Sequence, residues 1–419
     1  MIDRKVQPSI LPIEKIDFSK PKVFEMGAKT KLFCITSVSD QTARFDLYFD
    51  AGTIRGKSGL ASLVNGLLLS GTKDKTSQEI NEAMNSLGGY MESGISNENA
   101  VFSIYSLREN MLPIARIVFD AIQNCSFRED EIAELIADRK QKFKVSLEKV
   151  SVLAQRALKS RLFSNSEAYS HVGQLHDYDE ITKEELVNFH SEYYLQGLNR
   201  CVLVGGFSQD EIDAFMDIFG NWNTTKHPQV EKSFTNLKGG IHIEKEGAVQ
   251  TAIRVARPMF NKKHDDYIDF LVLHTILGDY FGSRLMSNIR EDKGYTYGIG
   301  SLVSELVETG YFMIATEVGK EVKDATLKEI RFEMERLQTE LIPQEELSLV
   351  KNYLLGQLLK SADGAYAMMD LYLSVEMQDL GLEFYNLSIE KINSIDSQRL
   401  MDLANKYLNW DDYTVVSAG

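Results

Sequence analysis

The strongest constraint on the fold of this chain is an internal duplication. The dipeptide Gly89-Tyr90 recurs as Gly294-Tyr295, and Tyr194-Leu195 recurs as Tyr407-Leu408. The two spacings are nearly equal, at roughly 205 and 213 residues, and a nearly constant spacing over half a chain indicates a repeated structural unit. We therefore predict two halves with the same order of strands and helices. A length of 419 residues agrees with this, because it is too long for a single hydrophobic core.

The first half contains clear strand and helix patterns. Apolar and polar side chains alternate over residues 43–50, which predicts a strand with one buried face. Apolar residues recur at helical spacing over 60–68, and Thr76 with Glu79 forms a capping box that begins a second helix. We further expect strands at 90–96 and 100–107, a helix near 110–124, and a long helical region from about 128.

The second half repeats this order. We expect a strand at 251–257, helices near 265–277 and 283–292, strands from 294 and at 310–317, and long helices near 322–341 and 344–360. The polar stretch 221–240 is rich in turn-forming residues, so we interpret it as a linker between a domain at 1–220 and a domain at 241–419. Because the strands alternate, each half is predicted to be an α+β domain with a mostly antiparallel or mixed sheet, covered by helices on one face.

Charge and cysteine content restrict the possible partners and compartment. The chain has 46 basic and 61 acidic residues, a net charge of −15, which disfavours binding to nucleic acid phosphates. Cys34, Cys125 and Cys201 are an odd number without a Cys-x-x-Cys spacing, so we read them as reduced thiols of a cytoplasmic protein. No run of apolar residues is long enough to span a membrane, and the first residues lack the apolar core of a secretory signal.

Several short motifs resemble catalytic sequences without matching them. Residues 66–73 place Gly-Thr-Lys where a phosphate-binding loop needs Gly-Lys-Ser/Thr, and no Gly-x-Ser-x-Gly occurs. His171 and His176 are five residues apart, a spacing that separates them on a helix. His264 precedes a predicted helix cap, and His274 lies on an apolar helix face as a packed core residue. The residues alone therefore predict no complete active site and no metal site.

The segment 59–72, Gly-Leu-Ala-Ser-Leu-Val-Asn-Gly-Leu-Leu-Leu-Ser-Gly-Thr, resembles the zinc-binding helix of the M16 peptidases, the family of pitrilysin and the mitochondrial processing peptidase. Members carry Gly-Leu-Ala-His-Phe-Leu-Glu-His, an apolar pair and Gly-Thr. Here Ser62 and Gly66 stand at the two histidine positions, and Asn65 stands at the position of the general-base glutamate. The family's third zinc ligand, a glutamate, would fall near 141–143, where this chain has no carboxylate. The resemblance therefore implies a degenerate site that holds no metal or other cofactor in this chain.

A second segment keeps the family's chemistry. Residues 289–298, Ile-Arg-Glu-Asp-Lys-Gly-Tyr-Thr-Tyr-Gly, resemble the segment in which an arginine and a tyrosine, seven residues apart, reach the M16 active site. Arg290 and Tyr297 match these two residues. Both are donors suited to a peptide carbonyl and to the oxyanion that develops on it. Without the resemblance, Arg290 would be an ordinary surface charge and Tyr297 an ordinary strand aromatic.

Some M16 proteins consist of two chains of about this length, one carrying zinc and the other carrying the Arg/Tyr pair, which clamp around an enclosed chamber. The resemblance implies that this chain is of the second type. It would be the non-zinc subunit of a heteromeric zinc metallopeptidase, inactive alone, with a homologous zinc-carrying partner and a peptide substrate. A catalytically inactive structural or interaction protein on the same fold remains the alternative, and the retained Arg/Tyr pair favours the first interpretation.

Overall fold

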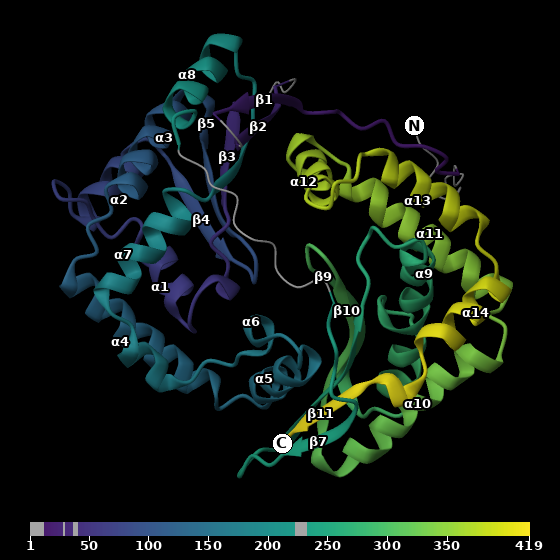
Figure 1. Cartoon of the computed structure of the whole chain (residues 1–419). Coiled ribbons are helices and arrows are strands. Elements are labelled where there is room, and N and C mark those ends of the chain that lie inside the picture. Colours follow the sequence, from purple (N-terminus) through teal and green to yellow (C-terminus); the bar gives the residue numbers. More distant parts are fainter. Residues whose placement is uncertain (1–11, 28–29, 37–40, 223–232) are drawn as a thin grey trace, which may run out of the picture.

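The computed structural model describes residues 12–27, 30–36, 41–222 and 233–419 and contains two mixed β-sheets, one in each half of the chain (Figure 1). In spatial order, the N-terminal sheet consists of β1 (Lys22–Met26), β2 (Thr30–Ile35), β6 (Leu198–Val204), β3 (Thr42–Phe49), β5 (Ala100–Leu107) and β4 (Tyr90–Ile95). The C-terminal sheet consists of β7 (Gly239–Ile243), β11 (Thr414–Ala418), β8 (Gln250–Met259), β10 (Gly310–Gly319) and β9 (Thr296–Glu305).

The two sheets have the same topology apart from the additional strand β1. In the N-terminal sheet β2 pairs with β6 in parallel, and in the C-terminal sheet β7 pairs with β11 in parallel. The other pairings that the structure describes are antiparallel. Two duplicated halves with mostly antiparallel, mixed sheets are thus confirmed, and the alternating strand patterns were the correct guide.

The helices follow a similar but not identical order in the two halves. In the N-terminal half they are α1 (Leu60–Leu67), α2 (Ser77–Ser86), α3 (Arg108–Gln123), α4 (Glu129–Ser146), α5 (Val150–Leu162), α6 (Glu167–Ser170), α7 (Lys183–Phe189) and α8 (Gln209–Phe219). In the C-terminal half they are α9 (Tyr267–Gly278), α10 (Lys323–Thr339), α11 (Gln344–Ser361), α12 (Ala365–Glu376), α13 (Glu383–Ser394) and α14 (Ser397–Tyr407). Short 3-10 or π-helical turns are η1 (Thr53–Arg55), η2 (Leu175–Glu180), η3 (His190–Tyr194), η4 (Met286–Asp292), η5 (Lys320–Val322) and η6 (Trp410–Asp412).

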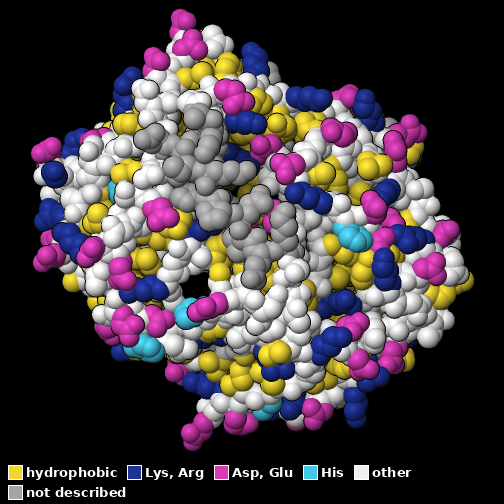
Figure 2. Space-filling model, viewed as in Figure 1, with side chains coloured by type: hydrophobic (Ala, Val, Ile, Leu, Met, Phe, Trp, Pro, Cys, Tyr) yellow, Lys and Arg dark blue, Asp and Glu magenta, His cyan; other side chains and the backbone are white. Residues whose placement is uncertain are grey.

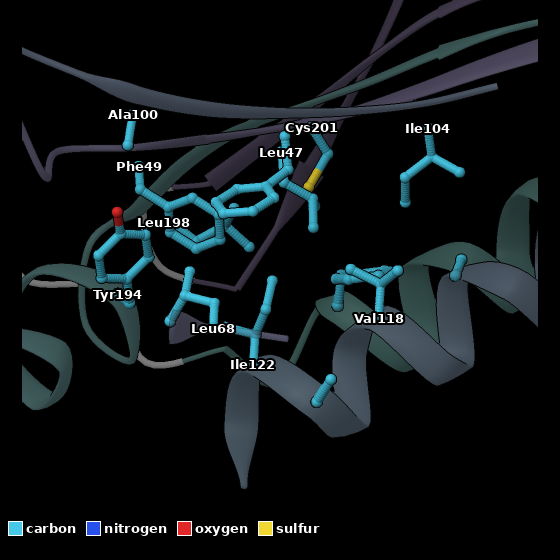
Figure 3. Packing of buried hydrophobic residues seen from close by; sticks show 14 of the residues in the cluster. Leu47, Phe49, Leu68, Ala100, Ile104, Val118, Ile122, Tyr194, Leu198 and Cys201 are labelled. Atoms are coloured by element: carbon cyan, nitrogen blue, oxygen red, sulfur yellow. The ribbon is translucent and has the colours of Figure 1, made fainter. Parts of the chain in front are cut away.

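The N-terminal core lies between one face of the sheet and the helices α1, α3 and α8. Leu47 and Phe49 of β3 are fully buried, and they face Val118 and Ile122 of α3 across the core (Figure 3). The capping box of Thr76 and Glu79 forms as predicted at the start of α2. In the C-terminal half, α9 is surrounded by other elements and buries almost every side chain, so its apolar residues cover its whole circumference and not one stripe.

Each sheet also meets one helix from the opposite half on its second face. Leu158 and Leu162 of α5 pack against Ala252, Ala256 and Val416 of the C-terminal sheet. Conversely, α12 packs Met369 and Leu373 against Phe33 and Val202 of the N-terminal sheet. Two ion pairs fasten α12 there: Arg44 Nη2 lies 2.6 Å from Asp370 Oδ1, and Arg200 Nε lies 2.8 Å from Glu376 Oε2. Each half therefore places one helix on the sheet of the other half, and α5 and α12 are here called the exchanged helices.

The two predicted domains are less separate than the sequence indicated, because residues near the start of the chain pack against the C-terminal half. Residues 12–18 cross to the C-terminal half, where Ile16 is buried and its N–H donates to Asn386 Oδ1 at 3.0 Å. Of the predicted linker 221–240, residues 223–232 lie outside the described residues, and Gly239 and Gly240 belong to β7. Among the helices in the described ranges, none combines the length and the apolar character needed to cross a bilayer.

Candidate functional site

Helix α1 carries the positions of the degenerate zinc motif. It begins after Gly59, whose left-handed φ of 84° lets the chain turn sharply into the helix. Leu60, Leu63 and Val64 point into the core, so Ser62 and Asn65 lie half-buried on the opposite side. Asn65 Oδ1 accepts a hydrogen bond from the Tyr194 hydroxyl at 3.1 Å, and Asn65 Nδ2 donates to Ser93 Oγ at 3.4 Å. The side chain at the general-base position is thus engaged in local structure.

Gly66 brings α1 close to α4, the helix on which the third ligand was expected. A Cβ atom at Gly66 would lie 3.0 Å from Leu135 Cδ2 and 3.4 Å from Arg139 Nη2. Residues 141–143, near the next turn of α4, add an amide, an ammonium and a phenyl ring. A hydroxyl, an engaged carboxamide and a glycine are not donors that hold zinc, so these residues do not fit the metal that the family motif implies.

Arg290 lies on the π-helical turn η4. Met286 and Ile289 of this turn are buried in the C-terminal core and fix its position. The Arg290 guanidinium lies over the ring of the exposed residue Phe281, 4.7 Å from its centroid. In the described part of the chain, Arg290 forms no ion pair, whereas Arg284 of the preceding segment binds Glu346 with two 2.9 Å hydrogen bonds. The contact of Arg290 with Phe281 is a cation–π interaction with a surface ring, which leaves the N–H donors of Arg290 available.

Tyr297 lies on β9 at a β-bulge. Thr296 pairs with Val318 and Ile299 pairs with Thr316, so Tyr297 and Gly298 together face the single residue Glu317. A bulge of this kind redirects a side chain and interrupts the regular ladder. The side chain of Tyr297 is 94% exposed, whereas Tyr295, two positions earlier, is half-buried against the C-terminal core.

A turn at Gly294 separates the two predicted site residues. Gly294 has a positive φ of 66°, and the Tyr295 N–H donates to the Ile289 carbonyl at 3.0 Å, which closes η4 onto the start of β9. Arg290 and Tyr297 are therefore on consecutive elements. No hydrogen bond joins them directly in the residues that the structure describes, so this structure leaves the two side chains available to a third group.

Two clefts lie near the junction of the two halves. Figure 2 shows an opening between the halves on the face in view. The first, here called the α1 cleft, has a volume of about 640 Å³ and is lined by the N-terminal part of α1, including Ser62, and by Lys57, Lys159 and His171. The second, the hairpin cleft, has a volume of about 670 Å³ and lies between the β4–β5 and β9–β10 turns, with Glu98, Lys159 and Gln378 in its lining. Sequence reasoning did not identify Lys159, because no motif surrounds it and its exposure depends on the packing of α5.

The histidines support only part of the sequence interpretation. His274 is buried, its Nδ1 lies 3.3 Å from Ser301 Oγ, and burial lowers its pKa to about 3, as expected of a neutral core residue. His264 Nδ1 accepts from the Asp266 N–H at 3.1 Å at the start of α9. The expected separation of His171 and His176 was wrong. Both rings lie within 3.8 Å of the Asp177 carboxylate, because an irregular segment and not one continuous helix joins them.

Comparisons with known proteins agree with this architecture. The family model described as insulinase (peptidase family M16) matches residues 33–174, and the model described as the peptidase M16 inactive domain matches residues 180–354. The beta subunit of the mitochondrial-processing peptidase of Neurospora crassa is 24% identical over 411 residues, which cover 90% of this chain and 83% of the relative. An uncharacterised zinc protease of Bacillus subtilis is 21% identical over 365 residues, 86% of this chain and 88% of the relative.

A solved structure shares the fold over nearly the whole length. The peptidase M16 inactive domain from Pseudomonas fluorescens superposes with a TM-score of 0.87 at 24% identity, and the match covers 96% of this chain and 98% of that one. The matched models span both halves, and the duplicated sheets account for two successive matches along one chain. The chain belongs to the M16 peptidase family.

Proposed function

We propose that this chain is the non-zinc subunit of a two-chain M16 peptidase, in which Arg290 and Tyr297 act on a peptide held at the zinc site of a homologous partner. The observation that carries the proposal is the state of Tyr297, an aromatic side chain that is 94% exposed at a β-bulge. A strand tyrosine kept for packing would be partly covered, as Tyr295 is. The phenol of Tyr297 instead has the solvent access that a donor to an external carbonyl needs.

The surroundings of Arg290 support the same role. An arginine kept as an ordinary surface charge would pair with nearby acids, and Glu291 and Asp292 follow directly in the sequence. Its described contact is the Phe281 ring, which orients the guanidinium without using its N–H groups. Zinc itself would supply a nucleophilic water in the partner, while this chain would hold the peptide carbonyl and the charge that develops on it.

Three further observations fit a partner-dependent subunit. Ser62, Asn65 and Gly66 offer no zinc ligands, so any zinc chemistry would have to come from another chain. One relative, the Neurospora crassa protein, is itself named as the beta subunit of a peptidase. The three cysteines are free, which suits a reducing compartment such as the cytoplasm.

The test is a reconstituted pair with the zinc-carrying M16 chain that co-purifies from the source cell. Tyr297→Phe should lower kcat by at least about tenfold, since loss of one oxyanion donor typically costs about 10²–10³ in rate. Arg290→Ala should have a comparable or larger effect and should also raise KM. Tyr295→Phe is the matched control, because it removes a hydroxyl from a neighbouring, half-buried tyrosine. Equal and small effects of all three substitutions would contradict the proposal and favour a purely structural role on this fold.

A further inference from the structure

Two threonine side chains bridge the β-bulge that carries Tyr297. In the described sheet β9 is the edge strand, so β10 is its only neighbour there. At the bulge, Tyr297 and Gly298 together face Glu317, which interrupts the regular hydrogen bonding between the two strands. Backbone groups left without a ladder partner need water or a side chain instead. The hydroxyls of Thr296 on β9 and Thr316 on β10, here called the threonine bridge, fill this need.

The hydrogen bonds of the threonine bridge converge on Gly298. The Gly298 N–H donates to Thr296 Oγ1 at 3.1 Å, and the Gly298 carbonyl oxygen lies 2.9 Å from both Thr316 Oγ1 and Thr296 Oγ1. Thr296 Oγ1 lies 2.8 Å from the Glu317 carbonyl oxygen, and the two hydroxyl oxygens are 3.0 Å apart. Each hydroxyl has one hydrogen, so one arrangement satisfies all three backbone groups. In it Thr296 donates to Glu317 and accepts from Gly298, while Thr316 donates to Gly298.

The bulge also determines the face of the sheet on which Tyr297 lies. Thr296 pairs with Val318 and Ile299 pairs with Thr316, and direct partners in an antiparallel pair share one face. Val318 and Ile299 belong to the C-terminal core, so both threonines lie on the core side. Tyr297 projects to the opposite side, where it is almost fully exposed. Loss of the bulge would require a one-residue change of register, and such a change turns side chains to the other face.

The threonine bridge is anchored from a third strand. Arg254 on β8 donates through Nη1 to the Thr316 carbonyl at 3.2 Å and to the Ile253 carbonyl at 2.9 Å. Contacts therefore run without a break from β8 through Thr316 and Thr296 to the backbone beside Tyr297. Because the Tyr297 ring is so exposed, packing contributes little to its position. The backbone that the two hydroxyls hold is what sets where the phenol stands.

We propose that Thr296 and Thr316 are positioning residues for Tyr297, whose hydroxyls fix the bulge so that the phenol meets the peptide carbonyl at the partner's zinc site. A donor held in place beforehand needs no rearrangement when charge develops on that carbonyl. A misplacement of about 1 Å can cost about 10²-fold in rate. The proposal rests on the proposed function for the role of Tyr297, whereas the threonine bridge itself is measurable in this chain alone.

Amide hydrogen exchange of the full chain tests the threonine bridge without a partner. Thr296→Val should speed exchange of the Gly298 amide by about tenfold, because valine keeps the shape of threonine but cannot accept the hydrogen bond. Thr296→Ser, which keeps the hydroxyl, should retain the slow exchange of the wild type. Thr309→Val is the matched control, since the Thr309 hydroxyl donates to the Met259 carbonyl at 2.8 Å in the turn of the same hairpin. It should leave exchange at Gly298 unchanged.

Kinetics of the reconstituted pair test the positioning role. Thr296→Val and Thr316→Val should each lower kcat by about three- to tenfold and leave KM within about twofold. In the Tyr297→Phe background neither should lower kcat further, because the hydroxyl that they position is already absent. Thr296→Ser should restore kcat, and Thr309→Val should not change it. A general structural defect would instead lower kcat equally in both backgrounds.

The outcomes separate this inference from the proposed function. Unchanged exchange at Gly298 in Thr296→Val overturns the threonine bridge. Faster exchange with an unchanged kcat, while Tyr297→Phe lowers kcat, overturns the positioning role and leaves the proposed function standing. If Tyr297→Phe itself leaves kcat unchanged, the proposed function and the positioning role both fail. A thermal unfolding curve of each variant shows that a lower kcat does not arise from lost folding.

Discussion

At the scale of single residues, Asn65 and Gly66 of the degenerate zinc motif stabilise the local packing of α1. Asn65 joins Tyr194 to Ser93 through two hydrogen bonds, and Gly66 allows α4 to approach closely. A glycine within a helix costs about 1 kcal/mol relative to alanine, so its presence needs a reason, and the contact with Leu135 provides one. The absence of zinc ligands therefore coincides with local packing that a larger side chain would disturb.

The first prediction concerns metal content. The purified full chain should hold substoichiometric zinc after dialysis, and EDTA should leave its Tm unchanged, because Ser62, Asn65 and Gly66 supply no set of zinc ligands. Replacing them together by His, Glu and His should lower the free energy of unfolding by about 1–3 kcal/mol, since the end of Leu135 must shift to admit a Cβ at position 66 and a glutamate at position 65 cannot donate to Ser93 Oγ. One tightly bound zinc per wild-type chain, lost on Asn65→Ala, would contradict this.

The second prediction concerns the pH dependence of stability through His274. Its pKa is lowered to about 3 in the folded chain by burial, whereas an unfolded histidine titrates near 6.5. Below pH 6.5 the unfolded state binds the proton first, so stability should fall with decreasing pH by up to about 1.4 kcal/mol per pH unit. His274→Gln should flatten this dependence between pH 6.5 and about 4 in urea titrations.

At the scale of elements, local sequence patterns predicted several strands, helices and caps. Features that depend on contacts with distant parts of the chain were not predictable in this way. The alternating strand at 43–50, the helix at 60–68 and the Thr76 capping box all appear, because each depends on nearby residues. The β-bulge at Tyr297 was not predictable in this way, since it exists only relative to Glu317 on β10. The place of Lys159 in the cleft lining and the proximity of His171 to His176 likewise depend on how α5 and the following irregular segment fold.

The exchanged helices α5 and α12 are the least predictable elements and lead to the third prediction. Leu158 is fully buried against Ala252, Ala256 and Val416, so Leu158→Ala should lower the free energy of unfolding by about 2–5 kcal/mol. The expected size reflects both the lost apolar burial and the cavity left between the halves. Denaturant titration would measure the change, and the matched control is Val145→Ala on the exposed face of α4, which should stay within about 0.5 kcal/mol.

A second measurement separates a local defect from weakened coupling between the halves. If α5 holds the two sheets together, calorimetry of Leu158→Ala should show a broadened or split transition, whereas the wild type should unfold in one. Leu373→Ala on α12 should have the same effect from the opposite side. A change below 1 kcal/mol at both leucines would mean that the exchanged helices contribute little to stability.

At the scale of the whole molecule, the halves are joined in more ways than one linker. Residues 12–18 lie against the C-terminal half, whereas β1 is the edge strand of the N-terminal sheet. Each sheet is also covered by a helix of the other half. These contacts between the halves fix the positions of the α1 cleft, the hairpin cleft and Tyr297 relative to one another. A surface that completes another chain's active site requires this preorganisation, because donors must meet the reacting carbonyl without a costly rearrangement.

The last prediction follows from the proposal that zinc is held by a partner chain, whereas Arg290 and Tyr297 belong to this one. The homogeneous chain should not cleave a quenched fluorescent peptide above the rate of buffer, because a carbonyl donor without a nucleophile stabilises a charge that never forms. Adding a zinc-carrying M16 chain should produce cleavage that EDTA abolishes and added zinc restores. The zinc-carrying chain alone should turn over at least about tenfold more slowly than the pair, since it lacks Arg290 and Tyr297.

Efficient, chelator-sensitive cleavage by this chain alone would contradict the assignment, and pairing without any gain in rate would favour a structural role. The mixing curve discriminates further, because a true heterodimer gives activity that saturates at equal amounts of the two chains.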